Sequence, residues 1–253
     1  MLPAGQTRTV VQLNHAFIAP DGHVWGALPG WEGAGTQGAI LISPHLQGRP
    51  RFAQYLVRLA AGGRSADPMP GVQRFVYVIS GQADLALDEG QHTLAAGHFA
   101  YLPPNVTHRI CAQTDAAQLI VFEKRYAPSP LDEARRPEVH VGDAWASKGE
   151  PFMGDEAARL RVLLPPELAY DMAVNLFTFQ PGAALPFVET HIMEHGLYLL
   201  EGQGVYRLDT SWYPIQAGDS IWMGPYCPQW FCAIGKSPSS YLYYKDINRD
   251  PLA

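Results

Sequence analysis

The sequence predicts an all-β protein made of two tandem β-barrels, and three observations lead to this prediction. Short apolar runs, each bounded by Gly, Pro, Asn or Asp, recur along the whole chain, which is typical of sandwiches and barrels. No long amphipathic helical pattern accompanies them, and the second half of the chain repeats the first. The expected strands are Phe52–Leu59, Arg74–Ile79, Ala83–Leu87, Phe99–Leu102 and Gln118–Phe122, followed by Met172–Phe179, Gly196–Leu200, Val205–Leu208, Ser220–Met223 and Tyr241–Lys245.

The repeat appears when the sequence is displaced by 121 residues. The run Tyr77–Gln82 then falls on Tyr198–Gln203, and the match continues without a gap to Lys124, which falls on Lys245. Such a register indicates two copies of one fold. Between the copies lies a Pro-rich and charged stretch typical of a linker. The predicted division is 1–126 for an N-terminal barrel with its arm, 127–150 for the linker and 151–253 for the C-terminal barrel.

Composition limits the classes of function. The chain has 253 residues, of which 47% are hydrophobic and 17% charged, with a net charge of -6, as expected for a globular protein. Because no stretch concentrates Lys and Arg, nucleic acid and anionic membranes are poor partners. The N-terminal stretch lacks the apolar core of a signal peptide, and no run is long enough to span a bilayer. Three cysteines without zinc spacing fit a reduced compartment, so a cytoplasmic protein is expected.

The stretch from Pro181 to Gly202 holds candidate metal ligands. Glu189, His191 and His195 have the same parity. If the segment is extended, their side chains point to the same face, since side chains alternate along a strand. A carboxylate with two imidazoles is a plausible ligand set, although a strand with a polar, solvated face would give the same pattern.

The first copy serves as an internal control for this interpretation. Pro68, Pro70 and Arg74 fall where the second copy has Glu189, His191 and His195, and His108 falls on Gln229. The fold therefore does not need the three ligands, and their presence in one copy favours a metal site in the second barrel alone. His108, without partners, is interpreted as a relic or a structural histidine.

These residues resemble the two motifs of the cupin superfamily, with substitutions. Glu189 stands in place of the first His of the first motif, His195 in place of its Glu, and Gln229 in place of the final His of the second motif. The resemblance implies a bicupin, that is, two tandem jelly-roll barrels.

The substituted set is more specific. Glu-Thr-His-X3-His-Gly, the turn before Tyr206, Gln229, and Tyr241-X3-Lys245 together resemble the (S)-ureidoglycine aminohydrolase family of purine (allantoin) catabolism. The resemblance implies hydrolysis of (S)-ureidoglycine to (S)-ureidoglycolate and ammonia, with one Mn²⁺ per chain, although Fe²⁺ would also suit the ligands. It implies metal ligands at Glu189, His191, His195 and Gln229, substrate contacts at Tyr206, Tyr241, Lys245 and Glu189, and catalytic roles for Lys245 and Glu189.

The chemistry of the residues agrees with the resemblance. Nitrogen and oxygen donors without a thiolate suit Mn²⁺ or Fe²⁺. Tyr241 and Lys245 lie four residues apart in a predicted strand, so they face the same way, and burial beside a cation would lower the pKa of the lysine toward proton-transfer use. Two simpler interpretations stay open: Lys245 is a strand-edge lysine, as its counterpart Lys124 suggests, and the tyrosines are core residues with a hydroxyl at the rim.

Other functions also stay open. A different metallocupin, such as a dioxygenase or an isomerase, is the nearest alternative, and a non-enzymatic small-ligand-binding or storage bicupin is another. The expected partner is a small-molecule substrate, and the chain is expected to form a homo-oligomer.

Overall fold

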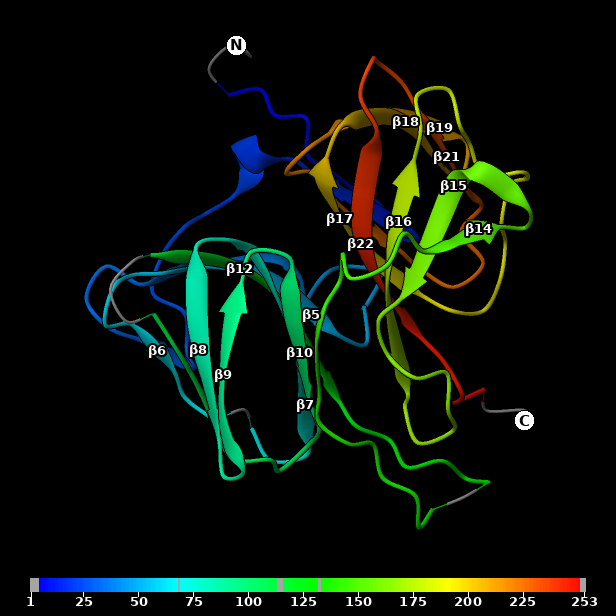
Figure 1. Ribbon diagram of the computed structural model, residues 1–253. Helices are drawn as coiled ribbons and strands as arrows, with labels where there is room; N and C mark the ends of the chain where they lie inside the picture. The colour runs from blue at the N-terminus through cyan, green and yellow to red at the C-terminus, as the bar shows by residue number, and fades with distance from the viewer. Residues whose placement is uncertain (1–4, 68, 113–115, 132, 251–253) are drawn as a thin grey trace.

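The computed structural model describes residues 5–67, 69–112, 116–131 and 133–250, which form two barrel-like halves lying side by side (Figure 1). Every strand expected from the sequence is present, and the all-β prediction is confirmed. Among the described residues there is no α-helix, only the 3₁₀ turn η1 at Pro20–Gly22, and no helix could cross a bilayer.

The first half consists of a six-stranded sheet packed on a five-stranded sheet. Their orders are β13-β10-β7-β12-β5-β4 and β3-β6-β11-β8-β9. The larger sheet contains β4 Gln37–Ile42, β5 Ala53–Leu59, β7 Val72–Ser80, β10 His98–Leu102, β12 Ala117–Arg125 and β13 His140–Asp143. The smaller contains β3 Trp31–Glu32, β6 Arg64–Ser65, β8 Gln82–Leu87, β9 Gly90–Ala95 and β11 His108–Cys111.

The second half has the same plan, with an eight-stranded sheet against a three-stranded one. Their orders are β1-β2-β20-β17-β22-β16-β15-β14 and β19-β18-β21. The larger sheet contains β1 Val10–Val11, β2 His15–Ile18, β14 Glu150–Phe152, β15 Asp155–Val162, β16 Met172–Phe179, β17 His195–Glu201, β20 Ser220–Met223 and β22 Ser239–Asp246. The smaller contains β18 Gln203–Leu208, β19 Ser211–Gln216 and β21 Gln229–Ala233.

The central strands are buried on both faces because the large sheets of the two halves pack against each other. In β12, Leu119 and Val121 enter the core of the first barrel, whereas Ile120 and Phe122 enter a third core between the halves. The same alternation in β22 explains its run of consecutive apolar residues. There Tyr241 and Tyr243 point into the second barrel, and Leu242 and Tyr244 point to the interface.

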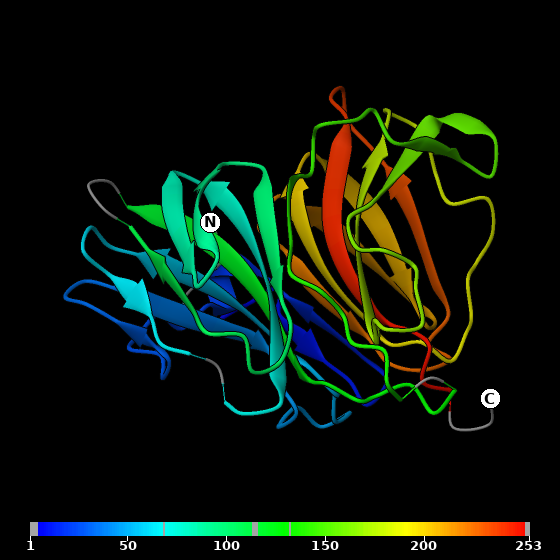
Figure 2. The same ribbon diagram turned by 60° about the horizontal axis from the view of Figure 1, so that its bottom comes forward.

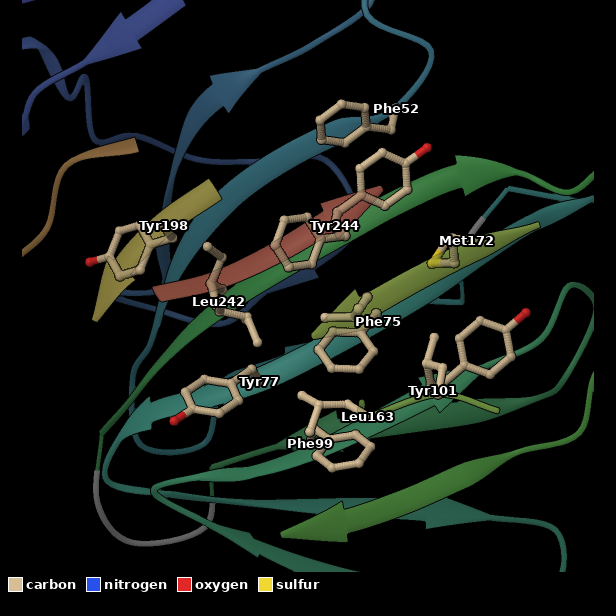
Figure 3. Close-up of a cluster of buried hydrophobic side chains, with 14 of the residues drawn as sticks. Phe52, Phe75, Tyr77, Phe99, Tyr101, Leu163, Met172, Tyr198, Leu242 and Tyr244 are labelled. Carbon is tan, nitrogen blue, oxygen red and sulfur yellow. The ribbon is translucent and has the colours of Figure 1, made fainter. Parts of the chain in front are cut away.

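Figure 3 shows this interface core, in which side chains of both halves interdigitate. The Phe52 ring stacks on Tyr244 of the opposite half, with ring centres 4.1 Å apart. Figure 2 shows the two halves side by side, with the second half meeting the first across the middle of the molecule. The barrels are therefore held as one body by apolar burial.

A segment that precedes each barrel in the sequence pairs with the large sheet of the other barrel. β2, which precedes the first barrel in the sequence, pairs with β20 of the second half. β13, which precedes the second barrel, pairs with β10 of the first half. The N-terminal arm therefore completes the second barrel's large sheet, and the segment expected to be a linker contributes a strand to the first.

A polar cluster near the candidate site joins the halves. Arg51, from the first half, directs its backbone N–H and its Nε to the Glu194 carboxylate, at 3.0 and 3.2 Å from Oε1. Its guanidinium also pairs with Asp246, whose Oδ1 accepts the Glu194 backbone N–H at 2.6 Å. Glu194 precedes His195 and Asp246 follows Lys245, so this cluster fixes the backbone beside two candidate site residues.

A second cluster lies at the equivalent position of the other half, with its charges reversed. Asp171 is the counterpart of Arg51, because each lies two residues before an alanine that pairs with the final strand of its half. The carboxylate of Asp171 accepts bonds from Gln73 at 2.5 Å and from Lys124 at 3.0 Å. Gln73 thus stands in place of Glu194, and Lys124 in place of Asp246.

Candidate active site

A cavity of about 470 Å³ lies inside the second barrel. Strands of both sheets line it, together with the segment that leads into β17. All the residues that the sequence proposed for the site face this cavity: Glu189, His191, His195, Tyr206, Gln229, Tyr241 and Lys245.

The segment before β17 is not the extended strand on which the parity argument was based. Residues between 180 and 194 form turns and irregular backbone, with two isolated β-bridges to β21, Ala184 to Cys232 and Glu189 to Gln229. The Glu189–Gln229 bridge has two backbone hydrogen bonds of 2.8 and 2.9 Å, which place both side chains at the cavity. His195 is the first residue of β17. The residues converge because a loop folds back on β21, not because a strand alternates.

His191 has one ring nitrogen committed and the other directed at a neighbour. Its Nδ1 lies 3.2 Å from the backbone oxygen of Met193, so Nδ1 carries the proton and donates it. The lone pair is then on Nε2, which lies 3.0 Å from Nε2 of Gln229. A backbone carbonyl that fixes the tautomer in this way is typical of histidines that bind metals.

His195 has a buried Nε2 with no hydrogen-bond partner. Its ring stacks on His191, with centres 4.8 Å apart, and lies nearly parallel to Tyr243 at 5.6 Å. Burial lowers the pKa of His195, and the neighbouring His191 and Lys245 lower it further. The ring is therefore neutral and can offer a lone pair to a metal ion. Even so, in the parts of the chain that the structure describes, no three His, Cys, Asp or Glu side chains cluster closely enough to form a metal site by themselves.

The charged groups of the cavity influence one another. Burial raises the pKa of Glu189, against the opposing effect of His191 and Lys245. Burial also lowers the pKa of Lys245, although Glu189 and Asp246 oppose that change. A carboxylate and an ammonium that both lose solvation are a suitable pair for moving a proton.

The two candidate tyrosines are fully enclosed. Burial raises the pKa of both Tyr206 and Tyr241, so their hydroxyls stay protonated and are available as donors. The Tyr206 hydroxyl lies 3.5 Å from Oε1 of Gln229.

The first barrel fills the equivalent position with an arginine. Arg74 is only 2% exposed, and its Nε lies 2.7 Å from Oε1 of Glu123. Its NH1 lies 2.9 Å from Nε2 of His108, and the His108 Nδ1 is 2.8 Å from the backbone oxygen of Val106. Both ring nitrogens of His108 therefore have partners, which makes it a structural histidine. Pro68 lies outside the described residues.

The sequence register was wrong by one residue at the end of the repeat. Arg74 pairs with Glu123, and its counterpart His195 pairs with Lys245. The structural counterpart of Lys245 is therefore Glu123, not Lys124. The second copy has one more residue before its last strand, and such a slip exchanges the two faces of a strand.

The correction removes the argument that Lys245 is a common strand-edge lysine. Lys124 lies on the interface face, where it binds Asp171, whereas Lys245 lines the cavity. The counterpart of Tyr241 likewise becomes Leu119, a core residue of the first barrel, instead of Ile120.

Three polar residues of the cavity were missed by the sequence analysis, namely Tyr243, Asn175 and Asn248. Tyr243 has the same parity as Tyr241 and Lys245, so that signal was available. Asn175, in β16, is 4% exposed and lines the cavity opposite Tyr243. It stands in a run of apolar residues, and only the polarity of its side chain distinguished it.

Comparisons with known proteins agree with the fold. The family model for a cupin domain matches residues 55–123 and again 175–244. A probable (S)-ureidoglycine aminohydrolase of Oryza sativa subsp. japonica is 43% identical over 98% of this chain and 78% of its own length. The (S)-ureidoglycine aminohydrolase of Escherichia coli is 36% identical over 94% of this chain and 90% of its own. Among solved structures, a putative glyoxylate-induced protein of Pseudomonas aeruginosa superposes with a TM-score of 0.88, at 31% identity, over 98% of this chain and 94% of that one.

Proposed function

This chain belongs to the (S)-ureidoglycine aminohydrolases of the cupin superfamily, and on that premise we propose that it carries out the reaction in the second barrel. There, (S)-ureidoglycine and water would give (S)-ureidoglycolate and ammonia, as a step of allantoin degradation. Membership in a hydrolase family favours this activity over the oxygenase, isomerase and storage functions that the sequence left open.

The observation that carries the proposal is the cavity itself. It gathers two imidazoles, a carboxylate, an amide, two tyrosines and a lysine, whereas the equivalent space of the first barrel is closed by the Arg74–Glu123 pair. A duplicated fold does not need this polar set for packing, since the other copy does without it.

The residues fit a divalent ion held by Glu189, His191, His195 and Gln229. The Nε2 of buried His195 has no partner, and the fixed tautomer of His191 presents the lone pair of its Nε2 to the cavity, where Gln229 now contacts it. Such a mixed nitrogen and oxygen set without sulfur suits Mn²⁺, with Fe²⁺ as the next candidate. When bound, the ion would supply a Lewis acid that holds the substrate carboxylate and polarises the groups around the reacting carbon.

The protein's own side chains would do the remaining work. Lys245, with its lowered pKa, donates a proton to the departing amine and takes one from the incoming water. Glu189, whose pKa is raised by burial, accepts the proton of the incoming water from Lys245 and returns it. Tyr206 and Tyr241 donate hydrogen bonds that hold the substrate so that water reaches one face of the carbon.

The test is to follow freshly generated (S)-ureidoglycine by proton NMR with and without the enzyme. Ureidoglycolate of a single hand should accumulate faster than in the spontaneous reaction. An unchanged rate with a racemic product would contradict the proposal. Assembly into a homo-oligomer in the cytoplasm remains a prediction from the sequence.

A further inference from the structure

We propose that Asn175 recognises the ureido end of the substrate, with its side-chain oxygen accepting a hydrogen bond from the ureido nitrogen. The inference rests on the proposed function, because the ligand in question is the substrate of that reaction. It adds a specificity residue on β16, a strand to which the sequence assigned no site residue.

The starting observation is an unpartnered oxygen. The structure describes two fully buried polar side-chain atoms of this cavity that have no hydrogen-bond partner, Nε2 of His195 and Oδ1 of Asn175. Buried polar atoms are almost always bonded, so each of these calls for a partner that the protein itself does not provide. The nitrogen suits a metal ion, whereas a neutral amide oxygen in a cavity suits an N–H donor of a ligand.

Tyr243 fixes the orientation of the amide. Asn175 and Tyr243 are directly opposite each other on β16 and β22, and their side chains are hydrogen-bonded. Since Oδ1 has no partner, the amide nitrogen makes this bond and the oxygen is turned away from Tyr243. The Tyr243 ring in turn lies flat against His195, which ties the amide to the candidate metal ligands.

The chemistry of the substrate calls for such an acceptor. A terminal ureido group presents two N–H bonds, and the cavity is otherwise rich in donors, namely the tyrosine hydroxyls and the Lys245 ammonium. Its other strong acceptors, Glu189 and Gln229, belong to the proposed metal set. Asn248, which also lines the cavity, directs its amide nitrogen away to the backbone oxygens of Glu167 and Tyr170, at 2.9 and 3.0 Å.

The first barrel shows what the position does when no ligand is recognised. The counterpart of Asn175 is Tyr55, because both lie opposite the matching residue of the final strand. Tyr55 fills the space with its ring, and its hydroxyl accepts a bond from the Trp31 indole at 3.3 Å. In the second barrel a smaller amide leaves room and an open acceptor at the same place.

The test compares two ligands on the metal-loaded enzyme by calorimetry. (S)-Ureidoglycolate carries the ureido group, and glycolate lacks it. In Asn175→Leu, which keeps the side-chain shape, we expect ureidoglycolate to bind about 10- to 100-fold more weakly while glycolate affinity and metal content stay unchanged. Tyr243→Phe, which removes the anchor of the amide, should show the same selective loss to a smaller degree. Should Asn175→Leu not fold, Asn175→Ala serves the same comparison.

The outcomes separate this inference from the proposed function. If the wild type neither binds ureidoglycolate nor deaminates ureidoglycine, the proposed function is wrong. If the wild type does both and the Asn175 variants bind ureidoglycolate as tightly as it does, or lose both ligands equally, Asn175 is not the ureido acceptor.

Discussion

Glu123 and Lys245 occupy the same place in the two barrels but carry opposite charges. Glu123 pairs with Arg74 on the neighbouring antiparallel strand, and Lys245 pairs in the same way with His195, the counterpart of Arg74. In the first barrel, Arg74 and Glu123 form an ion pair of 2.7 Å, so their charges cancel inside the barrel without a ligand. In the second, Lys245 lies beside a neutral histidine, and the carboxylate of Glu189 offsets its charge.

The first prediction concerns the amount of metal. Because the Arg74 guanidinium already lies against His108, a cation is excluded from the first barrel by charge and by space. We expect one divalent ion per chain by elemental analysis, loss of that ion in His191→Ala, and unchanged content in His108→Ala. Two equivalents per chain would contradict this placement.

The second prediction separates binding from proton transfer. Lys245→Met should retain the metal but lose turnover by about a hundred- to ten-thousand-fold, the usual effect of removing a positioned acid or base. Tyr241→Phe removes one hydroxyl and should cost less, mainly as a higher KM. Steady-state kinetics and metal analysis on the same preparations measure both effects.

Lys236→Met, at an exposed loop position, is the matched control for the lost lysine charge and should behave as the wild type. Full activity of Lys245→Met would show that the lysine has only a structural role.

The third prediction reassigns Lys124 to stability. Its ammonium is 3.0 Å from Asp171, a carboxylate that is completely buried. Lys124→Met leaves that charge with only its Gln73 and backbone partners, and loss of one partner of a buried pair typically costs about 3–5 kcal/mol. Urea denaturation should show a lower midpoint, whereas metal content below the transition should not change. Lys148→Met, on the surface, should leave the midpoint unchanged.

The fourth prediction concerns the support of the site from the opposite half. Arg51→Met removes the guanidinium that joins Glu194 to Asp246, the neighbours of His195 and Lys245. Groups that hold metal ligands in place commonly affect metal affinity by about 10- to 100-fold when replaced. We expect weaker metal binding in a chelator competition and reduced turnover.

Arg109→Met, an exposed arginine on β11, controls for the change in net charge. Equal metal affinity in Arg51→Met and Arg109→Met would show that the Arg51 cluster serves only to hold the halves together.

The sequence alone predicted the two-barrel fold because short strands and the internal repeat are local patterns. It also identified seven of the residues that line the cavity, among them Glu189, His191 and His195, which differ from their counterparts in the first copy. It could not find the β2 and β13 exchange, because pairing between distant strands leaves no periodic signal. The sequence also missed the one-residue insertion before β22. The ungapped register still matches a lysine, Lys124, to Lys245, so only the strand pairing shows the insertion.

The inverted charges of the two interface clusters have a consequence for how halves recognise each other. If two first halves met through this surface, Arg51 would face Lys124, and if two second halves met, Asp171 would face Glu194 and Asp246. Both pairings place like charges at the interface, and repulsion is strongest in the second, because Asp171 and Glu194 are buried. Only a first half against a second half satisfies every charge. The interface charges therefore favour the pairing of unlike halves, so a first half that folds early is not expected to associate with the first half of a neighbouring chain.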